Sequence, residues 1–247
     1  MHLRPHYRPS DHEVWSTLYA RMATYWQRYA NPHFLDGLIA LRLPTHNIPS
    51  LAEVNRRLTP ITGFRATPVS GCIPAPEFFA HLRRREFPTT ITIRPRHLLD
   101  YLPEPDIFHD VAGHVPMHTN PAFAATLVRV GEAAQAATGD PTALQALARF
   151  FWFTIEFGLM RTPRGLRAYG SGLLSSHGEL AHALESPSVE RRPATLDALL
   201  AQPFEIDHFQ PVLFTVDNFE HLYELTAKLE EKIASWPRTT SPFSRSS

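Results

Sequence analysis

The chain has 247 residues, of which 24 are Lys or Arg and 24 are Asp or Glu, so its formal net charge is zero. This balance, without any basic block, argues against nucleic acid or an acidic membrane surface as the main partner. A single cysteine, Cys72, excludes an intrachain disulfide and suits a reducing cytoplasm, and no apolar run is long enough to span a bilayer.

The first third of the chain is expected to be mainly helical after a short arm. Residues 1–9 contain repeated prolines and are predicted to form a flexible arm. Ser10 and Glu13 have the spacing of a capping box, and the apolar residues behind them recur at helical spacing to about Tyr29. Patterning then predicts helices over 34–43, 50–58 and 76–85, a strand over 65–69, and an alternating strand over 89–94.

The rest of the chain continues this pattern. Asn120-Pro121 and Asp140-Pro141 each offer a cap followed by a proline in the first turn, which predicts helices over 120–137 and 140–159. Further helices are predicted over 176–184, 195–200 and 219–234, and strands over 204–207 and 212–216. The segment 237–247 is rich in Ser, Thr and Arg, and disorder is expected there. We therefore expect one domain over 10–236, mainly α with a minor β component (α+β).

Two histidines and one glutamate suggest a metal site. His109 and His114 stand five positions apart in a segment that begins with Pro103, and Glu156 lies in an aromatic run that predicts burial. A buried carboxylate is costly unless it is paired or bound to a metal. Two imidazoles and one carboxylate form the set that holds non-haem iron(II) in many oxygenases.

The spacing of the two histidines is unusual for a helix. Residues i and i+5 do not share a face of a regular α-helix. We therefore predict that Asp106 caps a short helix carrying His109, that Gly113 allows a break, and that His114 lies at or beyond the helix end. An ion pair between Glu156 and an arginine remains an alternative. A zinc hydrolase is another, although that class usually shows His-Glu-x-x-His.

Several separate motifs resemble one family. The chain is similar to the catalytic domain of the pterin-dependent aromatic amino acid hydroxylases, in particular the bacterial phenylalanine hydroxylases, over roughly residues 10–235. The segments that carry this resemblance occur in the family's order: Thr62-Gly-Phe-Arg65, Pro103-Glu-Pro-Asp-Ile107, His109 to Pro116, Trp152 to Leu159, Ala168 to Ser176 with Gly178-Glu179, and Phe209-Gln-Pro211.

The resemblance implies a role for each motif position. It implies iron(II) on His109, His114 and Glu156, and a helical basket around the iron. A tetrahydropterin would stack on Phe78 and contact Gly71, Ile73, Asp110 and Phe151, where Asp110 and Phe151 replace the glutamate and tyrosine of many relatives. The amino acid substrate would be bound by Arg94, Pro105, Asp106, Trp152, Gly172, Ser175 and Ile206. Ser175 resembles the serine that hydrogen-bonds a ligand histidine.

The resemblance also implies the reaction. We expect a monomeric cytoplasmic monooxygenase that converts L-phenylalanine to L-tyrosine with O2, without nucleic acid or membrane partners. Trp152 should narrow the pocket against an indole, and an apolar Ile206 offers no partner for a substrate hydroxyl. Hydroxylation of tryptophan or at the meta carbon of phenylalanine are alternatives, and a non-catalytic sensor of aromatic amino acids is an alternative of another class.

Overall fold

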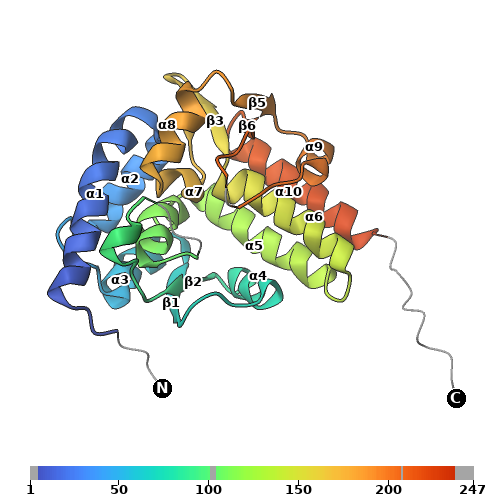
Figure 1. Cartoon of the computed structure of the whole chain (residues 1–247). Coiled ribbons are helices and arrows are strands. Elements are labelled where there is room, and N and C mark those ends of the chain that lie inside the picture. Colours follow the sequence, from blue (N-terminus) through green and yellow to red (C-terminus); the bar gives the residue numbers. More distant parts are fainter. Residues whose placement is uncertain (1–4, 101–103, 207, 237–247) are drawn as a thin grey trace, which may run out of the picture.

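Two groups of helices face each other, with small sheets at opposite ends of the space between them (Figure 1). The computed structural model describes residues 5–100, 104–206 and 208–236. One group contains α1 (Pro9–Tyr29), α2 (Pro32–Leu41) and α3 (Leu51–Thr62), and the other contains α5 (Pro121–Ala136), α6 (Pro141–Phe151) and α10 (Phe219–Ala234). This architecture confirms the prediction of a mainly helical α+β domain.

Short segments fill the space between these groups and carry most of the motif residues. The 3₁₀-helices are η1 (Arg96–Leu98) and η3 (Met117–Thr119), and the π-helices are η2 (Phe108–His114) and η4 (Trp152–Glu156). The remaining α-helices are α4 (Ala75–Arg83), α7 (Ser171–Leu174), α8 (His177–Glu185) and α9 (Leu196–Ala201). Within the described ranges, no helix combines the length and apolar character needed to cross a membrane.

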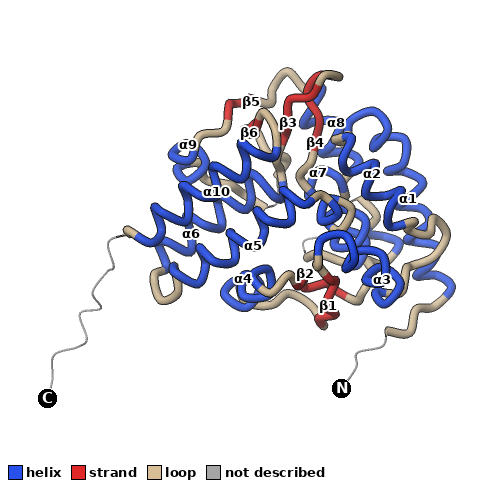
Figure 2. The backbone as a smooth tube through the Cα atoms, turned by 180° about the vertical axis from the view of Figure 1, so that it is seen from behind, coloured by secondary structure: helices blue, strands red, loops and turns tan. Residues whose placement is uncertain are grey.

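Two small sheets complete the fold (Figure 2). One is the parallel pair β1 (Arg65–Val69) and β2 (Glu86–Thr90). The other has the order β4-β3-β6-β5, with β3 (Leu159–Thr162), β4 (Gly165–Ala168), β5 (Glu190–Pro193) and β6 (Val212–Val216). The strands predicted over 65–69 and 212–216 are confirmed, whereas β3, β4 and β5 were not foreseen.

Two predicted strands are wrong in place or kind. The strand expected over 89–94 ends at Thr90, because the next residues turn toward the start of η2: Ile107 N donates to Thr92 O at 2.8 Å. The strand expected over 204–207 is irregular from Phe204 to Ile206, and its last residue lies outside the described residues.

Most helix predictions hold, with shifted ends. Asn120 and Asp140 accept hydrogen bonds from backbone N–H groups in the first turns of α5 and α6, as predicted. The capping box at Ser10 is wrong: α1 begins at Pro9 behind Arg8, whose N–H donates to the Asp11 carboxylate at 2.8 Å. The helix expected over 34–43 begins at Pro32 and ends at Leu41, followed by Arg42 in the left-handed region, and the helix expected over 50–58 runs to Thr62.

The predicted boundaries of the domain fall near the limits of the described residues. Residues 5–8 are not helical and lead into α1. The remainder of the predicted arm, 1–4, and the predicted tail, 237–247, lie outside the described residues.

The first helix is fastened to the centre of the molecule through its buried face. The predicted apolar series of α1 is buried as expected. Trp26 donates its indole N–H to Leu174 O at 2.7 Å, and its ring lies 6.5 Å from that of Phe108, nearly parallel to it. Since Leu174 ends α7 and Phe108 begins η2, α1 holds two of the short segments in place.

Candidate metal centre and its surroundings

The two histidines share one side of η2 because this segment is a π-helix. A π-helix has hydrogen bonds between residues i and i+5 and is wider than an α-helix, so residues five apart lie nearer to one face than they would on an α-helix. His109 Nε2 and His114 Nε2 accordingly lie 3.2 Å apart. The predicted break at Gly113 is therefore wrong, whereas the prediction that His114 lies at the helix end is confirmed, since His114 is the last residue of η2. The predicted cap is confirmed, since Asp106 Oδ1 accepts from His109 N at 3.0 Å.

Gly113 is needed for close packing rather than for a break. A Cβ at this position would lie 3.1 Å from Ser171 O and 3.1 Å from Ser175 Cβ. Both serines belong to the turn formed by α7 and its C-cap. The absence of a side chain at Gly113 thus lets α7 approach the π-helix that carries the histidines.

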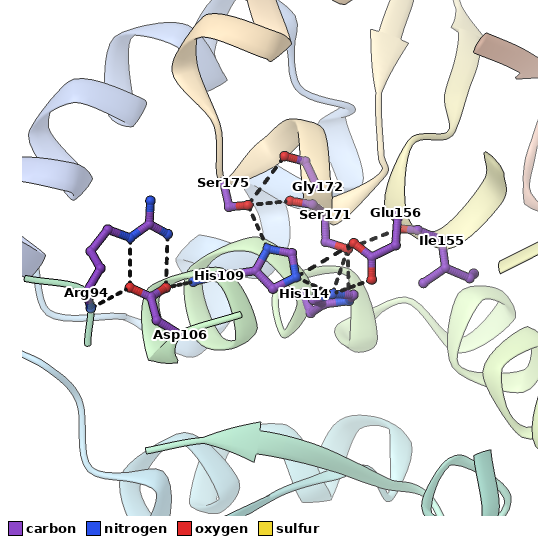
Figure 3. Close-up of polar contacts among 9 residues, drawn as sticks. All are labelled: Arg94, Asp106, His109, His114, Ile155, Glu156, Ser171, Gly172 and Ser175. Carbon is purple, nitrogen blue, oxygen red and sulfur yellow. Dashed lines mark hydrogen bonds and ion pairs between the residues drawn. The ribbon is translucent and has the colours of Figure 1, made fainter. Parts of the chain in front are cut away.

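Glu156 comes from the second π-helix, η4, and completes the predicted trio (Figure 3). Its Oε1 lies 3.0 Å from His114 Nε2, and its Oε2 lies 3.7 Å from His109 Nε2. One ligand atom from each of the three residues lies within 4.8 Å of the others. The helix predicted to reach Leu159 ends at Glu156 instead. Among the described residues, the ion-pair partners of Glu156 are these histidines and not an arginine.

Burial and charge give His109 and Glu156 the protonation states that a metal needs. Burial lowers the pKa of His109 to about 4, so its imidazole is neutral near pH 7. Burial opposes ionisation of Glu156, but the nearby His114 and His109 and hydrogen bonds from His114 and Ser171 outweigh it and bring the Glu156 pKa to about 2. A neutral imidazole and an anionic carboxylate are the forms that bind a metal ion.

Ser175 contacts His109 and fixes its tautomer, which confirms the hydrogen bond to a histidine that the resemblance implied. The Ser175 hydroxyl donates to Ser171 O at 2.9 Å and lies 2.8 Å from His109 Nδ1. Since its one proton is used on Ser171 O, it accepts from His109 Nδ1–H. The lone pair of His109 Nε2 is then free and faces Glu156 and His114 (Figure 3).

Ser171 is a site residue that the sequence analysis missed. Its hydroxyl lies 2.9 Å from ring nitrogens of His114, 3.1 Å from Ile155 O and 3.3 Å from Glu156 Oε2. It therefore touches the second histidine as Ser175 touches the first. The i, i+4 spacing of two serines within one of the family-like motifs was the signal that could have identified it.

Arg94 and Asp106 form a buried ion pair at the edge of the trio. Arg94 Nε and Nη2 donate to Asp106 Oδ2 and Oδ1 at 2.8 and 3.0 Å, and Arg94 N donates to Oδ2 at 3.0 Å. Burial would raise the pKa of Asp106, but the hydrogen bonds and charge of Arg94 lower it. Asp106 thus joins Arg94 to the capped start of η2. Pro105, which the resemblance assigns to the substrate site, precedes Asp106 in the chain and is exposed.

The predicted pterin contacts fall into two groups. Phe78 and Phe151 pack edge to face at 5.5 Å, and Phe87 connects them to the metal trio, with ring centroids 5.9 Å from Phe78 and 4.6 Å from His114. Gly71 and Ile73 lie half-buried in the loop between β1 and α4.

Asp110, which was also predicted to contact the pterin, lies buried on η2 next to His109. Its Oδ2 accepts from Thr90 N at 2.6 Å. Burial raises the pKa of this carboxyl to about 7. The structure therefore places Asp110 between the end of β2 and the π-helix of the two histidines.

The remaining predicted substrate contacts, Trp152, Gly172 and Ile206, differ in burial and packing. Trp152 is half-buried and packs against Phe157 and Phe204, with ring centroids 4.5 and 4.4 Å away. Gly172 is required by packing, because a Cβ there would lie 2.7 Å from the Phe157 ring. The side chain of Ile206 is 62% exposed. The prediction that Ile206 disfavours a substrate hydroxyl assumed that this side chain is buried in the pocket. Its exposure removes that assumption.

His118 is a buried histidine that the sequence analysis did not single out. Neither of its ring nitrogens has a hydrogen-bond partner among the described residues, and its ring packs against Phe64, Phe87 and Phe123. Burial lowers the pKa of this imidazole well below its usual value. An unpaired buried polar group costs about 1–3 kcal/mol.

His118→Leu is therefore expected to stabilise the protein, by about 1 kcal/mol at pH 8. Below pH 6.5 the unfolded chain binds a proton at His118 and the folded chain does not, so the wild type loses stability as the pH falls. Since the variant lacks this loss, the difference should widen at pH 5.5. Urea unfolding at both pH values measures it.

The exposed His97 supplies a control for this experiment. His97→Leu should leave the free energy of unfolding nearly unchanged, as surface substitutions usually do. A lower stability of His118→Leu at pH 8 would contradict the expectation and indicate that the imidazole has a partner such as a buried water.

Comparison with known proteins identifies relatives over nearly the whole chain. The family model for biopterin-dependent aromatic amino acid hydroxylases matches residues 4–239. A phenylalanine-4-hydroxylase from Caulobacter vibrioides is 43% identical over 233 residues, which is 93% of this chain and 79% of the relative.

Solved structures give the same result. The phenylalanine hydroxylase of Chromobacterium violaceum with bound iron(III) and oxidised 7,8-dihydrobiopterin superposes with a TM-score of 0.87 at 38% identity, covering 96% of this chain and 88% of that one. The cold-active enzyme of Colwellia psychrerythraea, without ligand, gives a TM-score of 0.88 at 36% identity, covering 94% and 89%.

Proposed function

This chain belongs to the biopterin-dependent aromatic amino acid hydroxylases, and we propose that it uses iron(II), a tetrahydropterin and O2 to convert L-phenylalanine to L-tyrosine. The observation that carries this proposal is the convergence of His109, His114 and Glu156 within 4.8 Å. Two imidazoles and one carboxylate suit iron(II) and leave coordination positions open. When bound, the iron would activate O2 with electrons from the pterin.

The side chains around the trio support specific roles. The Asp106 ion pair holds two nitrogens of the Arg94 guanidinium, and the outer edge of this planar group suits a bidentate grip on the substrate carboxylate. Phe78 offers a ring for the pterin to stack on, while Asp110 supplies a carboxyl that can hold or release a proton near pH 7. One oxygen atom would enter the substrate ring and the other would leave with the oxidised pterin.

Product identification tests this function directly. The protein is loaded with iron(II) without oxygen and then given a tetrahydropterin, O2 and one aromatic amino acid. We expect tyrosine from phenylalanine, with a higher kcat/KM for phenylalanine than for tyrosine or tryptophan. A higher value for either competitor, or a hydroxyl at the meta carbon, would overturn the assignment. Zinc retention without oxygen uptake would indicate a hydrolase instead.

Location and assembly belong to the same proposal. We place the protein in the cytoplasm, because its one cysteine, Cys72, is exposed and free, which suits a reducing compartment. We also expect a monomer that acts on small molecules. Sedimentation would show a mass near 28.0 kDa if this is right, and a stable tetramer would contradict it.

Ser175→Ala is expected to lower turnover by about 10–100-fold, as losses of groups behind a metal ligand usually do. The alanine cannot accept from His109 Nδ1–H, so the imidazole is free to rotate or to change tautomer. Iron affinity and turnover of the loaded protein measure the effect. Ser186→Ala, which removes an exposed hydroxyl that contacts Ser188, is the control. Unchanged iron affinity and turnover in Ser175→Ala would remove this serine from the site.

A further inference from the structure

Gln210 makes an unusually complete set of hydrogen bonds for a loop residue. It is 4% exposed, and its Oε1 accepts from the Trp152 indole N–H at 3.2 Å. Its Nε2 donates to Glu205 O at 2.8 Å and to His208 O at 3.0 Å. Since carbonyls can only accept and the indole N–H can only donate, these partners fix which end of the amide faces Trp152.

The loop that contains Gln210 lies against Trp152. Phe204, at its start, stacks on the indole with ring centroids 4.4 Å apart and planes 13° from parallel. At its end, Gln210 N donates to Glu179 Oε1 at 3.2 Å. The side chains of Ile206 and Phe209 between them are exposed. Trp152 and Glu179 are therefore two points at which this loop is held to the interior.

Trp152 in turn belongs to the π-helix that ends in Glu156. Its carbonyl accepts from Phe157 N at 2.9 Å, so its backbone is fixed by η4 itself. The indole still needs an acceptor for its N–H, because a tryptophan in a partly buried position normally finds one. Gln210 supplies that acceptor, and it therefore fixes the rotation of the ring rather than the position of the backbone.

We propose that Gln210 is a positioning residue for substrate selection: it fixes the indole of Trp152, and this indole sets which aromatic ring the pocket accepts. The inference rests on the proposed function, in which Trp152 forms a wall of the substrate pocket. Placement errors of about 1 Å can change rates by about 100-fold. A small rotation of this wall is therefore sufficient to alter the choice between a phenyl ring and an indole.

Gln210→Leu tests this role, because it keeps similar bulk and removes the acceptor. We expect the ratio of kcat/KM for phenylalanine to that for tryptophan to fall about tenfold, as loss of one hydrogen bond at a positioned group allows. The KM for phenylalanine should rise, while the KM for the pterin and the iron content stay unchanged. Gln210→Met, which keeps the length of the side chain, gives the same comparison if the leucine variant does not fold.

Gln202→Leu is the matched control. Gln202 also uses both ends of its amide, accepting from Arg192 Nη1 at 3.2 Å and donating to Pro203 O at 3.2 Å. It precedes the same loop, so its loss tests whether any disturbance of this region changes the substrate ratio. The ratio should stay at the wild-type value in this variant.

A double-mutant cycle with Trp152→Phe decides whether Gln210 acts through the indole. Phenylalanine at position 152 has no N–H, so Gln210→Leu should have little further effect on the ratio in that background. An unchanged ratio in Gln210→Leu, or an equal effect with and without Trp152, would overturn the proposal. Failure of the wild type to hydroxylate any aromatic amino acid would instead overturn the proposed function.

Discussion

Glu156→Gln is expected to remove iron binding and turnover together. The amide keeps the shape of the side chain but carries no charge, so the trio would lose its only anionic ligand. The carboxylate of Glu156 lies 3.0 Å from His114 Nε2 and 3.7 Å from His109 Nε2, so a neutral amide in its place would sit directly at the metal position. The loss should exceed the about 100-fold that removal of an outer partner of a metal ligand can cost. Iron content after anaerobic loading and turnover with phenylalanine measure the two effects separately.

A second partly buried glutamate, Glu179, provides the matched control. Glu179 accepts from Gln210 N through Oε1, and burial raises its pKa to about 7. Glu179→Gln makes the same chemical change away from the trio, so this variant should retain its iron. His109→Ala and His114→Ala should each lose both iron and activity. If Glu156→Gln kept full iron and full activity, Glu156 would have no place in the site.

The three candidate ligands that the structure brings together could be chosen from the sequence, but the local structure that unites them could not. Residue spacing excludes a shared face on a regular helix, and the sequence therefore predicted a break between His109 and His114. The π-helix that replaces the break depends on distant contacts: the approach of α7 over Gly113 and the hydroxyl of Ser171 against His114. Contacts between residues that are distant in the sequence produce no periodic pattern from which they could be predicted.

The missed strands have a related cause. β5 has the sequence Glu-Arg-Arg-Pro, which carries charges and a proline and gives no alternating pattern. It lies at the edge of its sheet, where charged residues and proline are tolerated, and it pairs in parallel with β6. Its partner fixes its conformation. Long helices such as α1 and α10 were found because their own buried faces repeat at helical spacing.

Arg94 and Ile206 show how far substrate contacts can be predicted from the sequence. The family motifs placed both at the substrate, and the structure buries Arg94 against Asp106 while leaving Ile206 exposed. The burial of Arg94 was not evident from its surroundings in the sequence, because its partner Asp106 lies 12 residues further along the chain. A strand was predicted over 204–207, but residues 204–206 form a loop. The orientation of this loop depends on the hydrogen bonds of Gln210, which the sequence does not reveal.

Arg94→Lys is expected to raise the phenylalanine concentration needed for half-maximal rate by roughly 10–100-fold, with iron content unchanged. Lysine keeps the positive charge but cannot offer two parallel N–H groups to Asp106 and to a substrate carboxylate at once. A hydrogen bond to a charged group contributes about 1.5–3 kcal/mol, which corresponds to a change of this size. Asp106 keeps its backbone donors, Arg94 N and His109 N, so the start of η2 should survive the change.

Arg191→Lys is the control that distinguishes the general effect of losing a guanidinium group from the specific loss of a substrate contact. Arg191 donates to the carbonyls of Ala183, Val189 and Ser186 at 2.7, 3.0 and 2.9 Å, and its replacement should lower stability without changing the requirement for phenylalanine. Phenethylamine, which lacks the carboxylate, gives a second test. The wild type and Arg94→Lys should handle it alike, because the group that Arg94 binds is missing. An equal impairment with both substrates would assign Arg94 a purely structural role, and unchanged phenylalanine binding would place the carboxylate elsewhere.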